Sequence, residues 1–220
     1  MVHRILALAT RNKGKISELR KLLSCYPVDI KSLDDFGPIP EVIEDGEDFE
    51  ENAYKKAHFT AKVLGFPAIA DDSGLVVDAL GGKPGVFSAR YAGENAGDRE
   101  NNIKLIKAME GKENRDAYFQ TIIAIAVPRG PALIYEGRCD GRITLNPEGS
   151  NGFGYDPVFY YPPLKKTFAQ MSLEEKNSVS HRGKAVLEMK NEFHKVLKWL
   201  ELRLKEEPQS ENEICINTKC

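Results

Sequence analysis

The chain has 220 residues, with 31 basic and 33 acidic side chains and a net charge of −2. This length suits one large domain or two small ones, and the balanced charge argues against nucleic-acid or membrane-surface partners. No apolar stretch approaches the roughly 20 residues of a membrane span. With no room for a signal peptide before the first strand and four scattered cysteines, we expect a cytoplasmic protein with free thiols.

The first predicted elements are a buried strand over residues 4–10 and a helix over residues 15–24. The loop between them holds polar and cationic side chains, namely Thr10, Arg11, Asn12, Lys13 and Lys15, together with Gly14. Free N–H groups at a helix N-terminus, with the positive end of its dipole, suit a phosphate group. A solvated basic turn explains the loop equally well, and the loop is not a Walker A motif because Ala9 replaces its first glycine.

A second strand is predicted over residues 28–32, and a carboxylate-rich linker over 38–48 leads into a helix over 49–64. Asp48 is a suitable N-cap for this helix. Most acids of the linker are expected at the surface, but one or two could reach a metal ion beside Asp72.

A short strand over residues 67–70 is predicted to end in two carboxylates, a hydroxyl group and a glycine that turns the chain: Asp71, Asp72, Ser73 and Gly74. Because neighbouring side chains of an extended chain point to opposite faces, Asp71 and Asp72 are expected to have different roles. A turn with good local hydrogen bonding is the alternative interpretation.

Further along, Asp98 is the predicted N-cap of a helix that ends near Met109. Strands over residues 117–127 and 132–140 are predicted to pair as an antiparallel hairpin, and another short strand to surround Ile143.

The loop over residues 149–157 has glycines on both sides of Phe153, so that its backbone can approach a flat ligand closely. Phe153 and Tyr155 offer aromatic faces, and Asp156 offers an acceptor. A purine could stack here, although aromatic residues in such a loop can equally belong to the core.

Ser172 opens a short helix with a capping box, and Ser180 caps a last helix whose apolar stripe runs to Leu204. His181 and Arg182 then lie in the first helical turn, where a cation opposes the dipole and where, with Lys176, it invites an anionic or carbonyl-bearing partner. The chain ends in a polar tail, residues 206–220, which is expected to be disordered.

Five motifs in this order resemble those of the inosine/xanthosine triphosphate pyrophosphatase family over roughly residues 4 to 200. They are Thr10-x-Asn12-x-x-Lys15, Ala70-Asp-Asp-Ser-Gly-Leu75, Gly81-Gly-x-Pro-Gly85 with Ser88-Ala-Arg-Tyr91, Gly152-Phe-Gly-Tyr-Asp-Pro157 and Glu175-Lys-x-x-x-Ser-His-Arg182. The resemblance implies an α/β fold with an elongated mixed β-sheet flanked by helices, one two-lobed domain over residues 1–205, and a central cleft. It also implies a homodimer.

The activity implied by the resemblance is Mg²⁺-dependent cleavage of ITP, dITP or XTP to the monophosphate and pyrophosphate. Residues 10–15 would then hold the triphosphate, and Asp72 would be the catalytic and metal-binding carboxylate, although Asp71 could activate the water instead. Glu44 would be the second metal ligand, with Glu47 as the alternative. The remaining substrate contacts would be Ser73, Phe153, Gly154, Tyr155, Asp156, Lys176, His181 and Arg182.

Selection of hypoxanthine over adenine requires donors aimed at the 6-oxo group and an acceptor for N1–H, which Arg182 and Asp156 could supply. Three alternatives remain at this point: a pyrophosphatase for other modified nucleotides, a nucleotide-sensing module without turnover, and a nucleic-acid-binding protein. The acids argue against the second, because carboxylates beside phosphates hinder binding unless a metal ion is present.

Overall fold

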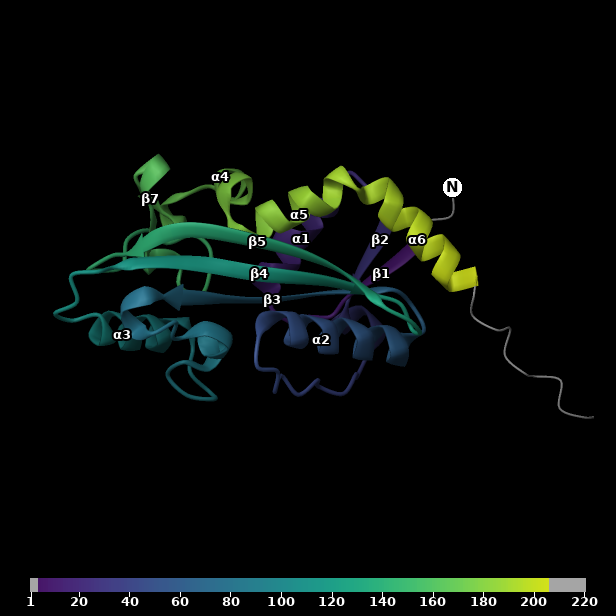
Figure 1. The fold of residues 1–220 in the computed structure, drawn as a ribbon, viewed down its shortest axis with the longest axis horizontal. Helices are drawn as coiled ribbons and strands as arrows, with labels where there is room; N and C mark the ends of the chain where they lie inside the picture. The colour runs from purple at the N-terminus through teal and green to yellow at the C-terminus, as the bar shows by residue number, and fades with distance from the viewer. Residues whose placement is uncertain (1–3, 206–220) are drawn as a thin grey trace, which may run out of the picture.

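The computed structural model describes residues 4–205 and builds them around one seven-stranded sheet with the order β2-β1-β3-β4-β5-β6-β7 (Figure 1). The strands are β1 (Arg4–Leu8), β2 (Val28–Ser32), β3 (Ala68–Val77), β4 (Asp116–Ala126), β5 (Ala132–Ile143), β6 (Phe159–Tyr161) and β7 (Lys166–Thr167). β1 is parallel to β2 and β3, and the later pairs are antiparallel. The expected mixed sheet is confirmed, whereas the tail over residues 206–220 lies outside the described residues.

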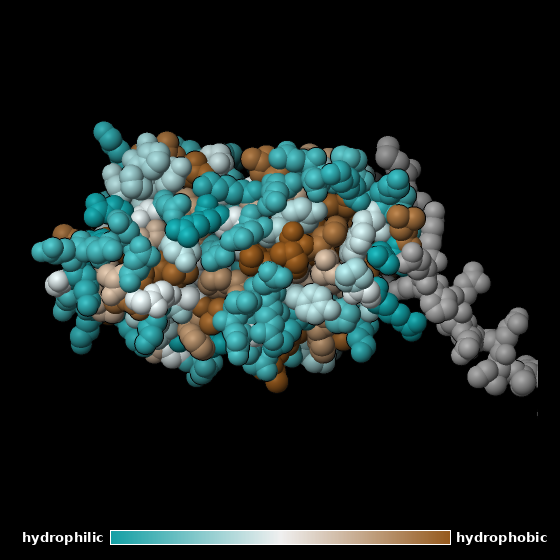
Figure 2. All heavy atoms as spheres, viewed as in Figure 1, coloured by the Kyte–Doolittle hydropathy of each residue, from teal (hydrophilic) through white to brown (hydrophobic). Residues whose placement is uncertain are grey.

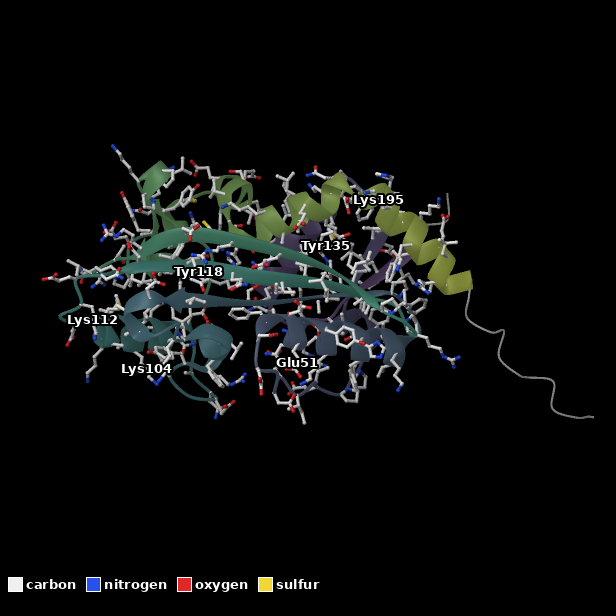
Figure 3. All side chains as sticks on the ribbon, viewed as in Figure 1. Glu51, Lys104, Lys112, Tyr118, Tyr135 and Lys195 are labelled. Carbon is white, nitrogen blue, oxygen red and sulfur yellow. The ribbon has the colours of Figure 1, made fainter. Side chains whose placement is uncertain are left out.

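Helices cover both faces of this sheet (Figure 1). One face carries α1 (Lys13–Leu23), α4 (Leu173–Val179), α5 (His181–Asn191) and α6 (Phe193–Lys205), and the other carries α2 (Phe49–Leu64) and α3 (Asp98–Ala108). Figure 3 marks the two layers by Lys195 on α6 and by Glu51 and Lys104 on α2 and α3. Within residues 4–205, every helix is too short or too polar to cross a membrane.

The two helical layers pack on separate apolar clusters. Under α1, α5 and α6 the sheet contributes Leu8, Ile69 and Ile123. On the other face α2 presents a stripe of alanines, Ala53, Ala57 and Ala61, to alanines of the sheet. Side chains this small let the helix approach the strands closely. The surface in Figure 2 is mostly hydrophilic, with hydrophobic residues gathered along its middle.

β1 stops early and leaves part of β3 open at one edge. The two strands pair only at Ala7–Ala68 and Leu8–Ile69, after which β1 gives way to the loop before α1. β3 continues to Val77, because β4 pairs with it along its whole length. After Ile69, this edge of β3 therefore has no paired strand from β1. The opening beside it can be reached from both faces of the sheet.

Several sequence predictions are wrong in detail. The N-cap of α3 is Gly97 rather than Asp98, which is the first residue of the helix. Asp71 to Gly74 form the middle of β3 rather than a turn, because pairing with residues 120–123 of β4 keeps this segment extended. Gly74 serves close packing instead of turning the chain, since a Cβ there would lie 2.6 Å from the Phe49 ring. Residues around Ile143 belong to β5, and the last helix is divided at Glu192.

The division at Glu192 does not interrupt the predicted apolar stripe. Met189, Phe193, Val196 and Leu200 are all buried on the same cluster. The Phe193 ring lies on Tyr26 with the ring centroids 3.7 Å apart. The helical axis therefore changes while the buried face stays continuous.

Candidate active site

The opening beside β3 is a cleft of about 530 Å³. Its walls come from the loop before α1, the acidic linker, α2, β3, the loop after Gly152, and the start of α5. Most of the predicted site residues line it: Thr10, Arg11, Asn12, Lys15, Glu44, Asp72, Ser73, Phe153, Gly154, Tyr155, Asp156, Lys176, His181 and Arg182.

The N-terminus of α1 forms one wall of this cleft. Asn12 is its N-cap, and its side-chain oxygen accepts hydrogen bonds from the N–H groups of Gly14 and Lys15 at 2.9 and 3.1 Å. Its amide nitrogen is thus the group that can donate to a ligand. Arg11 donates to the carbonyl oxygen of Ile39 at 2.9 Å and so joins this loop to the acidic linker.

Lys13 and Gly14 are the two predicted substrate-binding residues that do not line the cleft in the part of the chain that the structure describes. Lys13 is exposed. Gly14 lies under the Phe153 ring, where an added Cβ would come within 2.7 Å of a ring carbon. Its contribution is to let Phe153 close over the start of α1.

Asp71 and Asp72 point to opposite faces of the sheet, as the alternation of side chains predicts. Asp71 lies 3.0 Å from Lys15 Nζ and 2.8 Å from Arg182 Nη2, and accepts a hydrogen bond from Ser73 Oγ at 2.8 Å. Burial raises the pKa of Asp71, but the nearby cations Lys15 and Arg182 outweigh it and hold the pKa below its ordinary value. Asp71 is therefore ionised, and it fixes the positions of Lys15 and Arg182.

Asp72 faces α2, where Lys56 Nζ lies 2.6 Å from its Oδ1. Burial raises the pKa of Asp72 above the ordinary 3.8, and Lys56 opposes that rise. Of the two carboxylates, Asp72 holds a proton more readily. That property suits a group that takes a proton from water.

Glu44 meets Asp72 through the same lysine, since its Oε1 lies 3.4 Å from Lys56 Nζ. The linker that carries Glu44 is fixed from two sides: Arg90 donates to the Glu44 carbonyl oxygen at 3.2 Å, and the Gly46 N–H donates to Asn52 at 2.8 Å. Glu47 is exposed and lies outside this cleft, so Glu44 is the better placed of the two candidate metal ligands.

The residues present fit a hard divalent cation. The Lys56 ammonium already places one positive charge between the carboxylates of Glu44 and Asp72. Residues 4–205 hold no cluster of three or more acidic, His or Cys side chains suited to a metal ion. Mg²⁺ is commonly held by one or two carboxylates plus substrate phosphates and water, so two carboxylates suffice.

The far end of the cleft is a buried ionic network centred on Glu18. This side chain lies 2.8 Å from Lys176 Nζ and also pairs with Arg182. Lys176 continues to Asp156 at 2.6 Å, and its Nζ lies 4.6 Å from the centre of the Phe153 ring. All four ionic residues are nearly inaccessible to solvent.

His181 is also buried here, stacked on Phe119 with the ring centroids 4.7 Å apart. Burial, helped by Arg182 and Lys176, lowers its pKa well below 6.5. His181 is therefore neutral, and of the two predicted cations in the first turn of α5 only Arg182 carries charge. Tyr155 is mainly a core residue, and its hydroxyl donates to the Ser88 carbonyl oxygen at 2.8 Å.

Two residues of the site escaped the sequence analysis, Glu18 and Lys56. Glu18 follows Lys15 by three positions, which places it on the same side of α1. Lys56 similarly follows the buried Ala53 by three positions on α2. The available signal was helical spacing, from Lys15 on α1 and from the apolar stripe of α2.

This fold and cleft define an α/β protein whose site combines carboxylates, cations paired with them, and the aromatic ring of Phe153. The chain matches the model of the Ham1 family over residues 6–192. It therefore belongs to the Ham1 family.

The individual relatives cover nearly the whole chain. A protein named dITP/XTP pyrophosphatase from Syntrophobacter fumaroxidans is 60% identical over 207 residues, which cover 94% of this chain and 89% of that protein. A protein of the same name from Desulfotalea psychrophila is 59% identical over 203 residues, which cover 92% of this chain and 91% of that protein. The solved structure of a HAM1 protein from Coxiella burnetii has a TM-score of 0.80 at 40% identity, and the match covers 87% of this chain and 99% of that one. The resemblance and the fold class inferred from the sequence are confirmed.

Proposed function

We propose that this protein is a Mg²⁺-dependent nucleoside triphosphate pyrophosphohydrolase that converts ITP, dITP and XTP to the monophosphate and pyrophosphate. The observation that carries the proposal is the cleft itself, which Asp72 and Glu44 line together with Lys15 and Asn12, the N-cap of α1. Relatives up to 60% identical bear the name dITP/XTP pyrophosphatase, which supports the same substrate class.

The cationic wall would hold the phosphates. A triphosphate carries about four negative charges, and cations fixed in advance stabilise the further charge that develops when water attacks phosphorus. Lys15 is half-buried and already ordered by Asp71. Asn12 adds its side-chain amide nitrogen as a donor, because its side-chain oxygen already caps the N–H groups of Gly14 and Lys15.

Asp72 would accept the proton of the attacking water, because its pKa is raised while that of Asp71 is lowered. Asp72 and Glu44 would hold Mg²⁺, which supplies positive charge beside the reacting phosphate. Lys56 keeps the two carboxylates together and would exchange its contacts with them when the cation binds.

The loop over residues 153–156, with Lys176 and Arg182, would receive the base. In the structure Arg182 donates to Asp71 and Glu18, and Asp156 accepts from Lys176 and the Phe153 N–H. The predicted contacts of Arg182 and Asp156 with a 6-oxopurine would exchange with part of this network. Homodimer formation and a cytoplasmic location complete the proposal.

The decisive experiment is a substrate panel of ITP, XTP, dITP, dUTP, ATP and GTP with detection of pyrophosphate, with and without Mg²⁺. We expect pyrophosphate release from the first three to be much faster than from the other three, and to occur only with Mg²⁺. Asp72→Asn should lower kcat by about 10²–10⁴-fold while the circular dichroism spectrum stays native. Preference for dUTP, or binding of ITP without turnover, would contradict the proposal.

A further inference from the structure

We infer that Asp98 and Asn102, on α3, are positioning residues that set the base preference of the cleft by holding the Gly154 peptide. The inference rests on the proposed function and adds a determinant of substrate selection. α3 supplies no part of the ionic network around Glu18. Its two side chains act on the loop that carries Phe153 and Asp156.

Two side chains of α3 hold the backbone of one residue, Gly154, and we call this pair of hydrogen bonds the clamp. Asp98 Oδ2 accepts a hydrogen bond from the Gly154 N–H at 2.6 Å, and Asn102 Nδ2 donates to the Gly154 carbonyl oxygen at 2.9 Å. Asp98 and Asn102 are four positions apart and so share one side of α3. Gly154 has φ +62°, a conformation that a glycine adopts without strain.

Asn102 is kept at a cost to stability. It is buried, and its Oδ1 has no hydrogen-bond partner among the described residues. A buried acceptor without a partner is unfavourable. An apolar residue would avoid that cost, so the bond from Nδ2 to Gly154 is what this side chain contributes.

The backbone of Gly154, held at its N–H and its carbonyl oxygen, lies directly after Phe153. The Phe153 N–H donates to Asp156 at 2.9 Å, and the Phe153 ring covers Gly14 and Lys176. Tyr155 on the other side of Gly154 is anchored at Ser88. The orientation of Phe153 and Asp156 toward a base therefore depends on where α3 holds Gly154.

Such a dependence acts on selectivity because discrimination between 6-oxo and 6-amino purines comes from polar groups that pair with one and are left unpaired by the other. Displacements of about 1 Å are enough to lose such discrimination. The phosphate end of the cleft, at Lys15 and Asp72, lies on other elements and should be affected less.

The test uses four substitutions that separate hydrogen-bond chemistry from simple loss of a side chain. Asp98→Asn keeps an acceptor for the Gly154 N–H, whereas Asp98→Ala removes it. Asn102→Ala removes the donor, and Asn102→Asp opposes the Gly154 carbonyl oxygen with a second acceptor. Lys104→Ala is the matched control: Lys104 also lies on α3, but donates to the Tyr91 carbonyl oxygen outside this loop (Figure 3).

We expect Asp98→Ala and Asn102→Asp to lower the ITP-to-ATP ratio of kcat/KM by about 10-fold or more, with Asn102→Ala in between. The change should appear mainly as a higher KM for ITP, with kcat within about 3-fold of the parent. Asp98→Asn and Lys104→Ala should keep the parental ratio. Melting temperatures recorded in parallel identify any variant that is not folded.

An unchanged ratio in folded Asp98→Ala protein would overturn the inference, and so would an equal loss in Asp98→Asn. If the parent protein cleaves no ITP, the proposed function fails on its own. The clamp can then still be tested through the affinity for IMP by calorimetry. Equal IMP affinity in the parent and Asp98→Ala would overturn it in that case.

Discussion

Lys56 controls the protonation of the proposed catalytic carboxylate. Its ammonium lies 2.6 Å from Asp72 and opposes the rise in the Asp72 pKa that burial causes. The acidic limb of the kcat/KM profile reports the pKa of essential groups in the free enzyme. We therefore expect that limb above pH 3.8, the ordinary value for this carboxyl.

Replacing Lys56 by Met should move the acidic limb to higher pH. Loss of the nearby cation removes the interaction that opposes the effect of burial, so the Asp72 pKa rises further. The neighbouring Lys55 pairs with Asp45 and Glu51 at the surface, so Lys55→Met is a matched control that should leave the limb in place. A limb that stays put or moves to lower pH in Lys56→Met would refute the assignment of Asp72 as the base.

Arg182 should contribute to base preference and to stability at once. Arg182→Ala removes a donor expected to face the 6-oxo group, so the ITP-to-ATP ratio of kcat/KM should fall. It also leaves Asp71 and Glu18 buried with fewer partners, which costs about 3–5 kcal/mol.

Arg182→Lys separates these two effects. It retains the charge but not the bidentate geometry of the guanidinium. We expect Arg182→Lys to recover most of the stability, measured by urea unfolding, and little of the base preference. Recovery of the full ITP-to-ATP ratio with Lys would show that charge alone is required.

At the level of residues, sequence reasoning found the acids and cations but not their partners. The alternation of side chains correctly separated Asp71 from Asp72. It could not show that Glu18 joins Lys176 and Arg182, because those contacts span 158 and 164 positions of the chain. Nor does a sequence reveal which buried charges neutralise one another.

At the level of elements, α5 rests on β5 at a point where β5 has no side chain. A Cβ on Gly137 would come within 2.7 Å of the Ala185 nitrogen, and still closer to the His181 carbonyl oxygen. This close approach sets the position of the first turn of α5, which carries His181 and Arg182.

Gly137→Ala should therefore displace α5 and damage the site and the fold together. Overpacking against backbone atoms costs about 1–3 kcal/mol, which corresponds to a fall in Tm of roughly 3–10 °C. We expect kcat/KM for ITP to fall in the same variant. Normal activity and an unchanged Tm would show that α5 adjusts freely to the added methyl group.

Elements defined by local signals were predicted well. The ranges of β2 and α2 agree with the sequence prediction, because helix periodicity, the Asp48 cap and flanking turns are all local. The extent of β3 was missed, since polar residues 71–73 read as a turn until their pairing with β4 is known. Long-range pairing overrode the local preference.

For the whole molecule, the family resemblance predicts a homodimer, and one surface suits it. A hollow of about 780 Å³ opens on the α2 side of the sheet, lined in part by Val76, Tyr118 and Ile122. Phe87 at this hollow is 56% exposed. Apolar side chains grouped in this way commonly mark interaction sites.

If the proposed homodimer forms through this surface, Phe87→Asp should yield a monomer, because a carboxylate buried at the contact would lose its water. Leu145→Asp is the control, since Leu145 is 70% exposed but lies outside this hollow. Light scattering after size-exclusion chromatography gives the mass directly. The same mass for both variants as for the parent would exclude this surface.

The pairing of Glu18 with Lys176 and Arg182 has a consequence for how the chain matures on the ribosome. The first helix made carries a carboxylate whose partners follow it by 158 and 164 positions of the chain. Until they emerge, Glu18 must remain hydrated, and the pocket for the base cannot form. We expect catalytic competence to appear late and abruptly during synthesis, so that nascent chains halted before Lys176 bind no nucleotide base.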